Sequence, residues 1–213
     1  PYLGWVQYPF ILLGTWFHEM GHGVASLIVG GTFEFLEIYK NGGGVAYANL
    51  ANSYLPSSLA KAIMAAGGLL GPAIIGSIFI AAAKHHKSSM ILLRLLAGVI
   101  ILSLLLWIRS FWGLIVMSTY VFVLFGIMYL KNRKLEIITI LFLGLQCILS
   151  TYLQIDYLFT KQFERNGEIQ ISDTQAIAEN TFGVYWLWAF VIMLLSSYII
   201  WKSIKFYFSR KNV

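Results

Sequence analysis

Six long apolar segments constrain what this chain can fold into more than any other feature of its sequence. A helix of roughly 17–25 predominantly apolar residues is long enough to cross a bilayer, and it satisfies its own backbone hydrogen bonds in lipid. The sequence therefore predicts an all-α polytopic membrane protein, with about six transmembrane helices in one bundle. Because residues 109–110 join two segments tightly, a count of five or seven stays open. The segments cover residues 9–29, 59–83, 90–108, 111–130, 135–153 and 182–204.

The composition supports this class. Of the 213 residues, 59% are hydrophobic and 11% are charged, whereas soluble domains carry about 25% charged residues. We therefore expect the lipid bilayer to surround a single membrane-embedded domain over residues 1–213. The net charge of +6 is concentrated in short connections, so we predict no nucleic-acid partner. The sequence leaves open the oligomeric state, and whether residues precede Pro1 in the natural protein.

Lysine and arginine residues are distributed unevenly between the connections. By the positive-inside rule, the side that carries more of them is cytoplasmic. This rule predicts that both termini are cytoplasmic and that the first apolar segment runs outward. On the cytoplasmic side of a six-span topology are Lys84, Lys87, Lys131, Arg133, Lys134, Lys202, Lys205, Arg210 and Lys211, with His85 and His86 expected to be surface residues.

The first apolar segment contains the sequence His18-Glu19-Met20-Gly21-His22. Residues four apart lie on one face of a helix, so both imidazoles can bind one ion. Two histidines, a third protein ligand and a water make the open shell of a catalytic zinc site. Glu19 lies next to that face and can accept a proton from the water, as in other metalloproteases with this motif. Ionisable groups in lipid are costly unless paired or coordinated, which favours a Zn2+ site over two buried histidines of purely structural role.

Two short stretches after this helix are rich in aromatic and β-branched residues. They flank Asn41 and three glycines, and this pattern predicts a short β-hairpin at about residues 32–50. The hairpin is either a plain loop outside the membrane or part of the binding site. In the second case, the edge of a strand beside the zinc site holds an extended substrate by main-chain hydrogen bonds.

The third zinc ligand has two candidates in an outer loop predicted at about residues 154–181, which contains a short amphipathic segment. Asp156 lies among apolar residues just past the fifth apolar segment, where a carboxylate needs a partner. Asp173 opens the amphipathic segment, where its alternative role is to cap the N-terminus of a helix. Periodicity leaves this choice open.

Three parts of the sequence together resemble the site-2-protease-type (M50) membrane metalloproteases, and most of all the compact M50B-like branch. They are residues 18–25 followed by Gly30-Gly31, the stretch Gly67-Gly68-Leu69-Leu70-Gly71-Pro72, and residues 172–181. The resemblance implies Zn2+ bound by His18 and His22, Glu19 as the catalytic base, and hydrolysis of a peptide bond within or near a membrane. It also favours Asp173 over Asp156 as the third ligand, because the segment around Asp173 is similar to that branch.

Two functions compete under this resemblance. The first is a zinc-dependent intramembrane endopeptidase that cleaves transmembrane protein or peptide substrates. The second is a catalytically inactive M50-like membrane protein that binds client helices. Its support is that better-known members take their third ligand from an Asp-Gly pair, whereas the matching region here, residues 109–113, has no aspartate. A membrane oxidoreductase or metal carrier would need further histidines in the apolar segments, and the sequence has none there.

Overall fold

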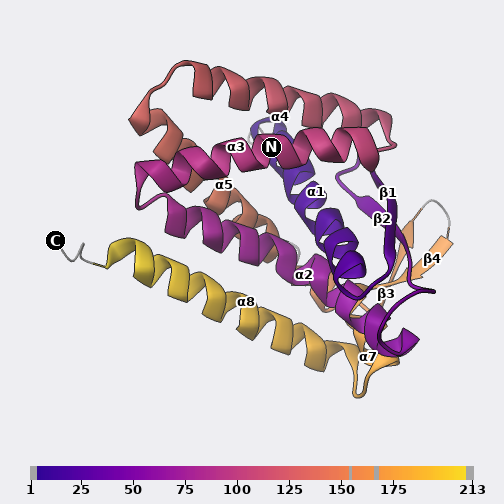
Figure 1. The fold of residues 1–213 in the computed structure, drawn as a ribbon. Helices are drawn as coiled ribbons and strands as arrows, with labels where there is room; N and C mark the ends of the chain where they lie inside the picture. The colour runs from indigo at the N-terminus through magenta and orange to yellow at the C-terminus, as the bar shows by residue number, and fades with distance from the viewer. Residues whose placement is uncertain (1–3, 154, 166–167, 210–213) are drawn as a thin grey trace.

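The computed structural model describes residues 4–153, 155–165 and 168–209. Long helices dominate this part of the chain, and two short hairpins lie together at one end of the bundle (Figure 1). This is the predicted polytopic helical fold with a hairpin after the first helix. Gln154, Arg210 and Lys211, which the predictions above include, lie outside the described residues. The elements are α1 (Gly4–Ile28), β1 (Thr32–Ile38), β2 (Gly44–Asn49), α2 (Ser57–Ala82), α3 (His86–Leu106), α4 (Phe111–Tyr129), α5 (Arg133–Leu153), α6 (Ile155–Leu158), β3 (Gln162–Arg165), β4 (Glu168–Ile171), α7 (Asp173–Asn180) and α8 (Tyr185–Phe208).

Five of the six predicted segments form helices that are long and apolar enough to cross a membrane, namely α2, α3, α4, α5 and α8. Within the described residues α1 is not among them, although it has 25 residues. His18, Glu19 and His22 help to explain the difference, because each lowers the mean hydropathy of the helix. All three side chains are buried. The neighbouring elements, rather than lipid, therefore surround α1 at this point.

Close packing of α1 on α2 forms the centre of the fold. α2 also packs against α5 and α8, and it runs between α3 and α8 in Figure 1. Glycine permits the contact with α1, because a β-carbon added at Gly21 would overlap the carbonyl oxygen of Gly67. Small residues let helix backbones approach closely in lipid. The glycine-rich stretch of α2 is therefore a packing surface that brings α2 against the histidine-bearing helix.

The predicted hairpin at about residues 32–50 is confirmed as an antiparallel pair, β1 with β2. The other edge of β1 is covered by the connection between α3 and α4. Here the Leu36 N–H donates to the carbonyl of Trp107 at 2.9 Å, and the Arg109 N–H donates to the carbonyl of Leu36 at 3.0 Å. The Ile38 N–H donates to Ser110 Oγ at 2.8 Å. Residues 107–110, which overlap the region without the Asp-Gly pair, therefore hydrogen-bond to β1 of the hairpin.

The outer loop is more structured than predicted. Strands β3 and β4 form a second antiparallel hairpin, and the predicted amphipathic segment is α7. The hairpin had a sequence signal, since the segment contains Asn166-Gly167, a dipeptide typical of hairpin turns, followed by alternating polar and apolar residues at 168–171. Leu158 of α6, Ile177 of α7 and Ala189 of α8 share an apolar cluster with α2. This cluster fastens the outer loop to the bundle.

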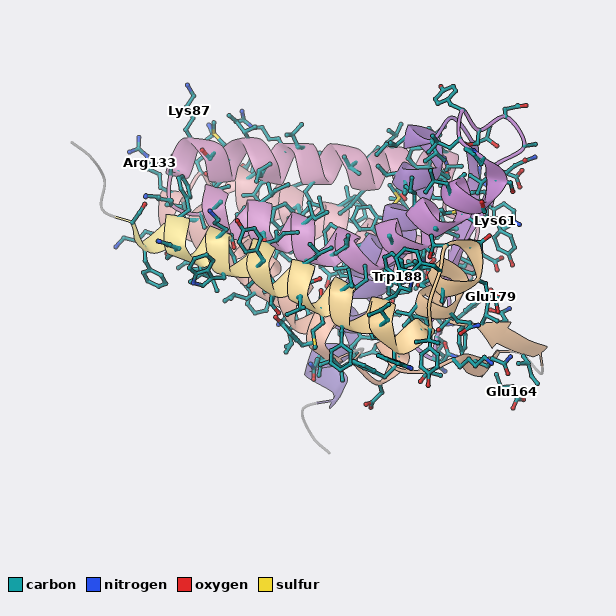
Figure 2. All side chains as sticks on the ribbon, turned by 90° about the horizontal axis from the view of Figure 1, so that it is seen from below. Lys61, Lys87, Arg133, Glu164, Glu179 and Trp188 are labelled. Carbon is teal, nitrogen blue, oxygen red and sulfur yellow. The ribbon has the colours of Figure 1, made fainter. Side chains whose placement is uncertain are left out.

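Charged side chains are distributed unevenly between the two ends of the bundle. Figure 2 shows Lys87 and Arg133 at the end away from the hairpins, and Lys61, Glu164 and Glu179 at the other. The positive-inside rule assigns the end with the excess of lysine and arginine to the cytoplasm. Which end faces the cytoplasm stays a prediction.

His86, predicted to be a surface residue, is partly exposed and contacts a carboxylate of another helix. Its Nε2 atom lies 2.5 Å from Oε2 of Glu136, which is buried in the first turn of α5. The His86 side chain is 31% exposed, and the Glu136 side chain is 7% exposed. The pair joins the start of α3 to the start of α5. Local sequence could not indicate it, because the two residues are far apart in the chain.

Replacing His86 by alanine is expected to destabilise the fold by about 1–3 kcal/mol, because it leaves the buried Glu136 carboxylate without this partner. Denaturant unfolding of detergent-solubilised protein measures the change. His85→Ala is the matched control, since His85 is exposed and its side chain makes no capping bond. Equal stability of the two variants would show that the ion pair contributes nothing.

Candidate metal centre

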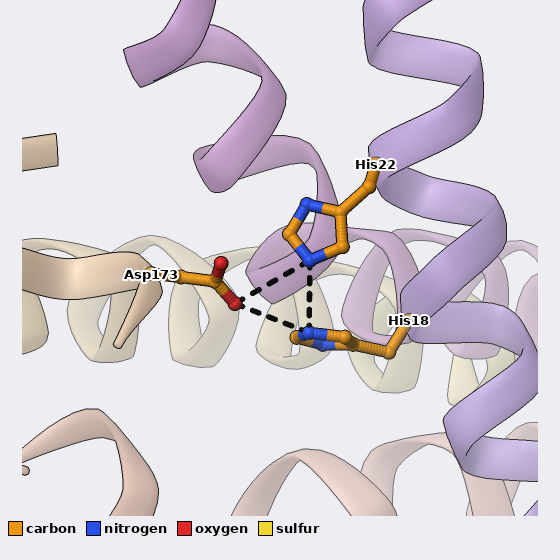
Figure 3. Close-up of side chains that lie close together, drawn as sticks. All are labelled: His18, His22 and Asp173. Atoms are coloured by element: carbon orange, nitrogen blue, oxygen red, sulfur yellow. Dashed lines mark hydrogen bonds and ion pairs between the residues drawn. The ribbon is translucent and has the colours of Figure 1, made fainter. Parts of the chain in front are cut away.

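His18 and His22 lie one turn apart on α1 and direct their imidazoles to the same point. Their Nε2 atoms are 3.0 Å apart, and both residues are buried. Figure 3 shows the two rings on one side of this point and Asp173 on the other. Oδ2 of Asp173 lies 3.1 Å from Nε2 of His18 and 3.4 Å from Nε2 of His22. Within the described residues, these three side chains form the one group whose ligand atoms could hold a metal.

This arrangement fits a zinc ion. Ligand atoms placed about 2.0–2.1 Å from a tetrahedral ion lie about 3.3 Å from one another. The three separations here, 3.0, 3.1 and 3.4 Å, are close to that value. Two imidazoles and one carboxylate are also a donor set of catalytic zinc sites, which keep the fourth position open.

A hydrogen bond from α2 orients His22. Nδ1 of His22 lies 2.8 Å from the carbonyl oxygen of Met64. A carbonyl only accepts, so Nδ1 carries the proton, and in the neutral ring Nε2 then holds the lone pair that can bind an ion. The same helix leaves space for the ring, because a β-carbon added at Gly68 would overlap the imidazole. The glycine-rich stretch of α2 therefore shapes the metal centre as well as packing against α1.

Asp173 reaches the histidines from the first position of α7. The cap of this helix is Ser172, whose side chain accepts from the Gln175 N–H at 3.2 Å. The capping role considered for Asp173 thus belongs to its neighbour, and the Asp173 carboxylate points to the centre. Asp156, the other candidate, is exposed on α6 and is not part of the group. That Asp173 binds metal remains a prediction, which this geometry favours.

The charge state of Asp173 follows from its surroundings. Burial alone would raise the pKa of its carboxyl, but in the metal-free protein the charge of protonated His22 and hydrogen bonds with both imidazoles hold that pKa well below its ordinary value. Tyr157 donates from its hydroxyl to Oδ2 of Asp173 at 3.1 Å. Burial, and then the Asp173 charge, raise the pKa of this phenol, so it remains a proton donor. Sequence patterns had not singled out Tyr157, since its partner lies 16 residues away.

Glu19 lies beside His18 and is buried. It lines both of the larger cavities at the centre. A β-carbon added at Gly44, the first residue of β2, would lie 2.8 Å from Oε1 of Glu19. The carboxylate therefore lies close to the start of β2 and lines the same cavities as His18.

Two cavities meet at this centre, and both are lined by Gly44, Tyr157 and Phe163. The larger, about 410 Å³, extends along β2 past Val45 and Ala46 and is bounded by α2 and α7. The smaller, about 330 Å³, extends along residues 41–43. Together they form a cleft that follows the edge of β2 and passes the histidines. Within the described residues β2 pairs with β1 alone, and Gly44, Val45 and Ala46 of this strand line the cleft.

Comparison with known proteins agrees with these features. The family model described as Peptidase M50B-like matches residues 3–203. No curated protein and no solved structure matches this chain. The matched residues include α1, both hairpins, α7 and most of α8. The chain therefore belongs to the M50B-like peptidase family.

Proposed function

We propose that this protein is a zinc-dependent intramembrane endopeptidase, which hydrolyses peptide bonds within or near the transmembrane segments of other membrane proteins. The observation that carries the proposal is the convergence of His18, His22 and Asp173 at distances suited to zinc, with Glu19 beside them. Family membership and five apolar helices support both the peptidase chemistry and the membrane setting.

Each residue has a distinct part in the reaction. His18, His22 and Asp173 hold the zinc ion, which when bound supplies Lewis-acid chemistry to a peptide carbonyl and a water molecule. Glu19 accepts a proton from the attacking water and then donates it to the nitrogen of the leaving amine. Met64 keeps the proton of His22 on Nδ1, through its carbonyl oxygen.

The free edge of β2 is the proposed binding site for the substrate. A peptide bond inside a helix is shielded by its neighbours, so the substrate must unwind before it is cleaved. An extended segment beside Gly44 to Ala46 would gain main-chain hydrogen bonds with β2 and would pass the metal centre through both cavities. Single-span proteins, or the remnants of an earlier cleavage, are the proposed substrates, and both termini of the enzyme are proposed to be cytoplasmic.

Metal analysis tests this proposal without a known substrate. Detergent-purified parent protein is expected to hold close to one zinc ion per chain by elemental analysis. His22→Ala and Asp173→Ala are each expected to lose most of that metal, because each removes one of three ligands. Asp156→Ala is the matched control and should keep the metal, since Asp156 is exposed and outside the group.

Two results would contradict the proposal. Absence of zinc from well-folded parent protein would favour the catalytically inactive protein that binds client helices. Loss of zinc in Asp156→Ala, with zinc retained in Asp173→Ala, would assign the third ligand to the other aspartate.

A further inference from the structure

The third proposed ligand of the metal centre, Asp173, lies on a short helix. Asp173 begins a helix of 8 residues outside the long helices of the bundle, whereas His18 and His22 are fixed on α1. A carboxylate on so short an element needs additional contacts to hold its position. Those contacts come from α6 and the residues that follow it.

Tyr157 of α6 contacts Asp173 through two hydrogen bonds. Its hydroxyl donates to Oδ2 of the carboxylate at 3.1 Å and accepts from the Asp173 backbone N–H at 3.3 Å. Oδ2 is also the oxygen that faces Nε2 of both histidines. The Tyr157 hydroxyl therefore links the side chain of Asp173 to the backbone of the same residue. It does so through Oδ2, the oxygen that faces the two histidines.

The ring of Tyr157 is itself held on two sides. Its centroid lies 6.3 Å from that of His18 and 5.4 Å from that of Phe163, and both contacts are edge-on. The first contact joins the tyrosine to the histidine helix, and the second joins it to β3. The hydroxyl therefore has a defined direction before any metal binds.

We propose that Tyr157 is a positioning residue for the metal centre, whose hydroxyl holds Oδ2 of Asp173 at the distance that a shared ion requires. Groups that hydrogen-bond to metal ligands orient those ligands, and their removal typically lowers metal affinity or activity by about 10–100-fold. The inference rests on the proposed metal site. It adds a residue that neither the motif nor the ligand geometry includes.

A purely structural role is the alternative. Other hydrogen bonds also join α7 to the preceding residues: Thr174 Oγ1 donates to the carbonyl of Leu158 at 2.9 Å, and the Ser172 N–H donates to the carbonyl of Lys161 at 3.1 Å. Thr174→Val removes one of these bonds without touching the carboxylate. It therefore separates general attachment of α7 from positioning of Asp173.

The experiment compares metal binding by the parent, Tyr157→Phe and Thr174→Val in detergent. Tyr157→Phe keeps the ring contacts and is expected to weaken zinc binding about 10–100-fold and to change the visible spectrum of bound Co2+. Thr174→Val is expected to lower the unfolding temperature of metal-free protein but to keep the parent Co2+ spectrum. In Asp173→Asn protein, adding Tyr157→Phe should cause little further loss of affinity, because the two residues act together.

The possible failures are distinguishable. A parent that binds no metal would contradict the proposed function itself. A metal-binding parent with equal affinity and an equal Co2+ spectrum in Tyr157→Phe would overturn the role of Tyr157 alone. Equal losses of affinity in Tyr157→Phe and Thr174→Val, or an unfolded Tyr157→Phe protein, would overturn it as well, since the tyrosine would then only attach α7.

Discussion

Replacing Glu19 by glutamine is expected to leave the bound metal in place and to lower peptide hydrolysis by about 10²–10⁴-fold. Glutamine has nearly the shape of glutamate, so the packing of the buried side chain beside Gly44 is preserved. Its amide cannot accept the proton that the attacking water must lose. The three proposed ligands are untouched, so the metal should remain.

The measurement uses a panel of synthetic single-span peptides in detergent micelles, with products identified by mass spectrometry and zinc content determined on the same samples. Glu34→Gln is the control, because Glu34 is exposed on β1 and lines neither cavity. Cleavage at the parent rate by zinc-loaded Glu19→Gln protein would exclude Glu19 as the base. Cleavage that is lost equally in Glu34→Gln would indicate damage to the hairpin instead.

The long helices and the histidine pair could be predicted from sequence because both depend on local geometry. Residues 18 and 22 share a helix face in any α-helix, so their convergence needs no knowledge of the rest of the chain. The apolar segments likewise mark their own helices by length. Among the described residues, α1 is the long helix that does not meet the criterion for a membrane span. The polar residues of the motif lower its mean hydropathy, and neighbouring elements bury them.

The rest of the site depends on contacts between distant residues. Periodicity leaves Asp156 and Asp173 open as the third ligand, and only the family resemblance of the segment around Asp173 favours that residue. In the structure Asp156 is exposed, whereas the Asp173 carboxylate is 16% exposed and lies beside His18 and His22. The contact of Tyr157 with Asp173 likewise joins residues that are 16 positions apart in the chain. The β3–β4 hairpin did have a local signal, namely the dipeptide Asn166-Gly167 and the alternating residues 168–171. The sequence analysis predicts a loop with one amphipathic segment here and does not include this hairpin.

The glycine-rich stretch of α2 shows how a correct prediction can be incomplete. Small residues at this position predict close helix packing, and Gly67 has that role against Gly21. Gly68, one residue later, lies against the His22 ring instead. The carbonyl of Met64, one turn earlier, accepts from the same ring. A packing surface and the orientation of a proposed ligand therefore share one turn of helix, which spacing alone does not reveal.

Gly68→Ala is accordingly expected to weaken zinc binding by about 10–100-fold, the range seen when the orientation of a metal-binding histidine is disturbed. The added methyl group would overlap the imidazole of His22. The ring would have to move away from the carbonyl of Met64 and from its place opposite Asp173. A zinc titration in detergent measures the loss, and hydrolysis should fall with it.

Two further glycines make this prediction specific. Gly98→Ala in α3 adds the same methyl group where no atom lies within 4 Å, so it should leave both stability and zinc affinity near the parent values. Gly21→Ala would press on the backbone of Gly67, so it should mainly lower the unfolding temperature by forcing α1 and α2 apart. Parent-like zinc affinity in Gly68→Ala would show that the His22 ring tolerates displacement, and that the close approach of α2 contributes packing alone.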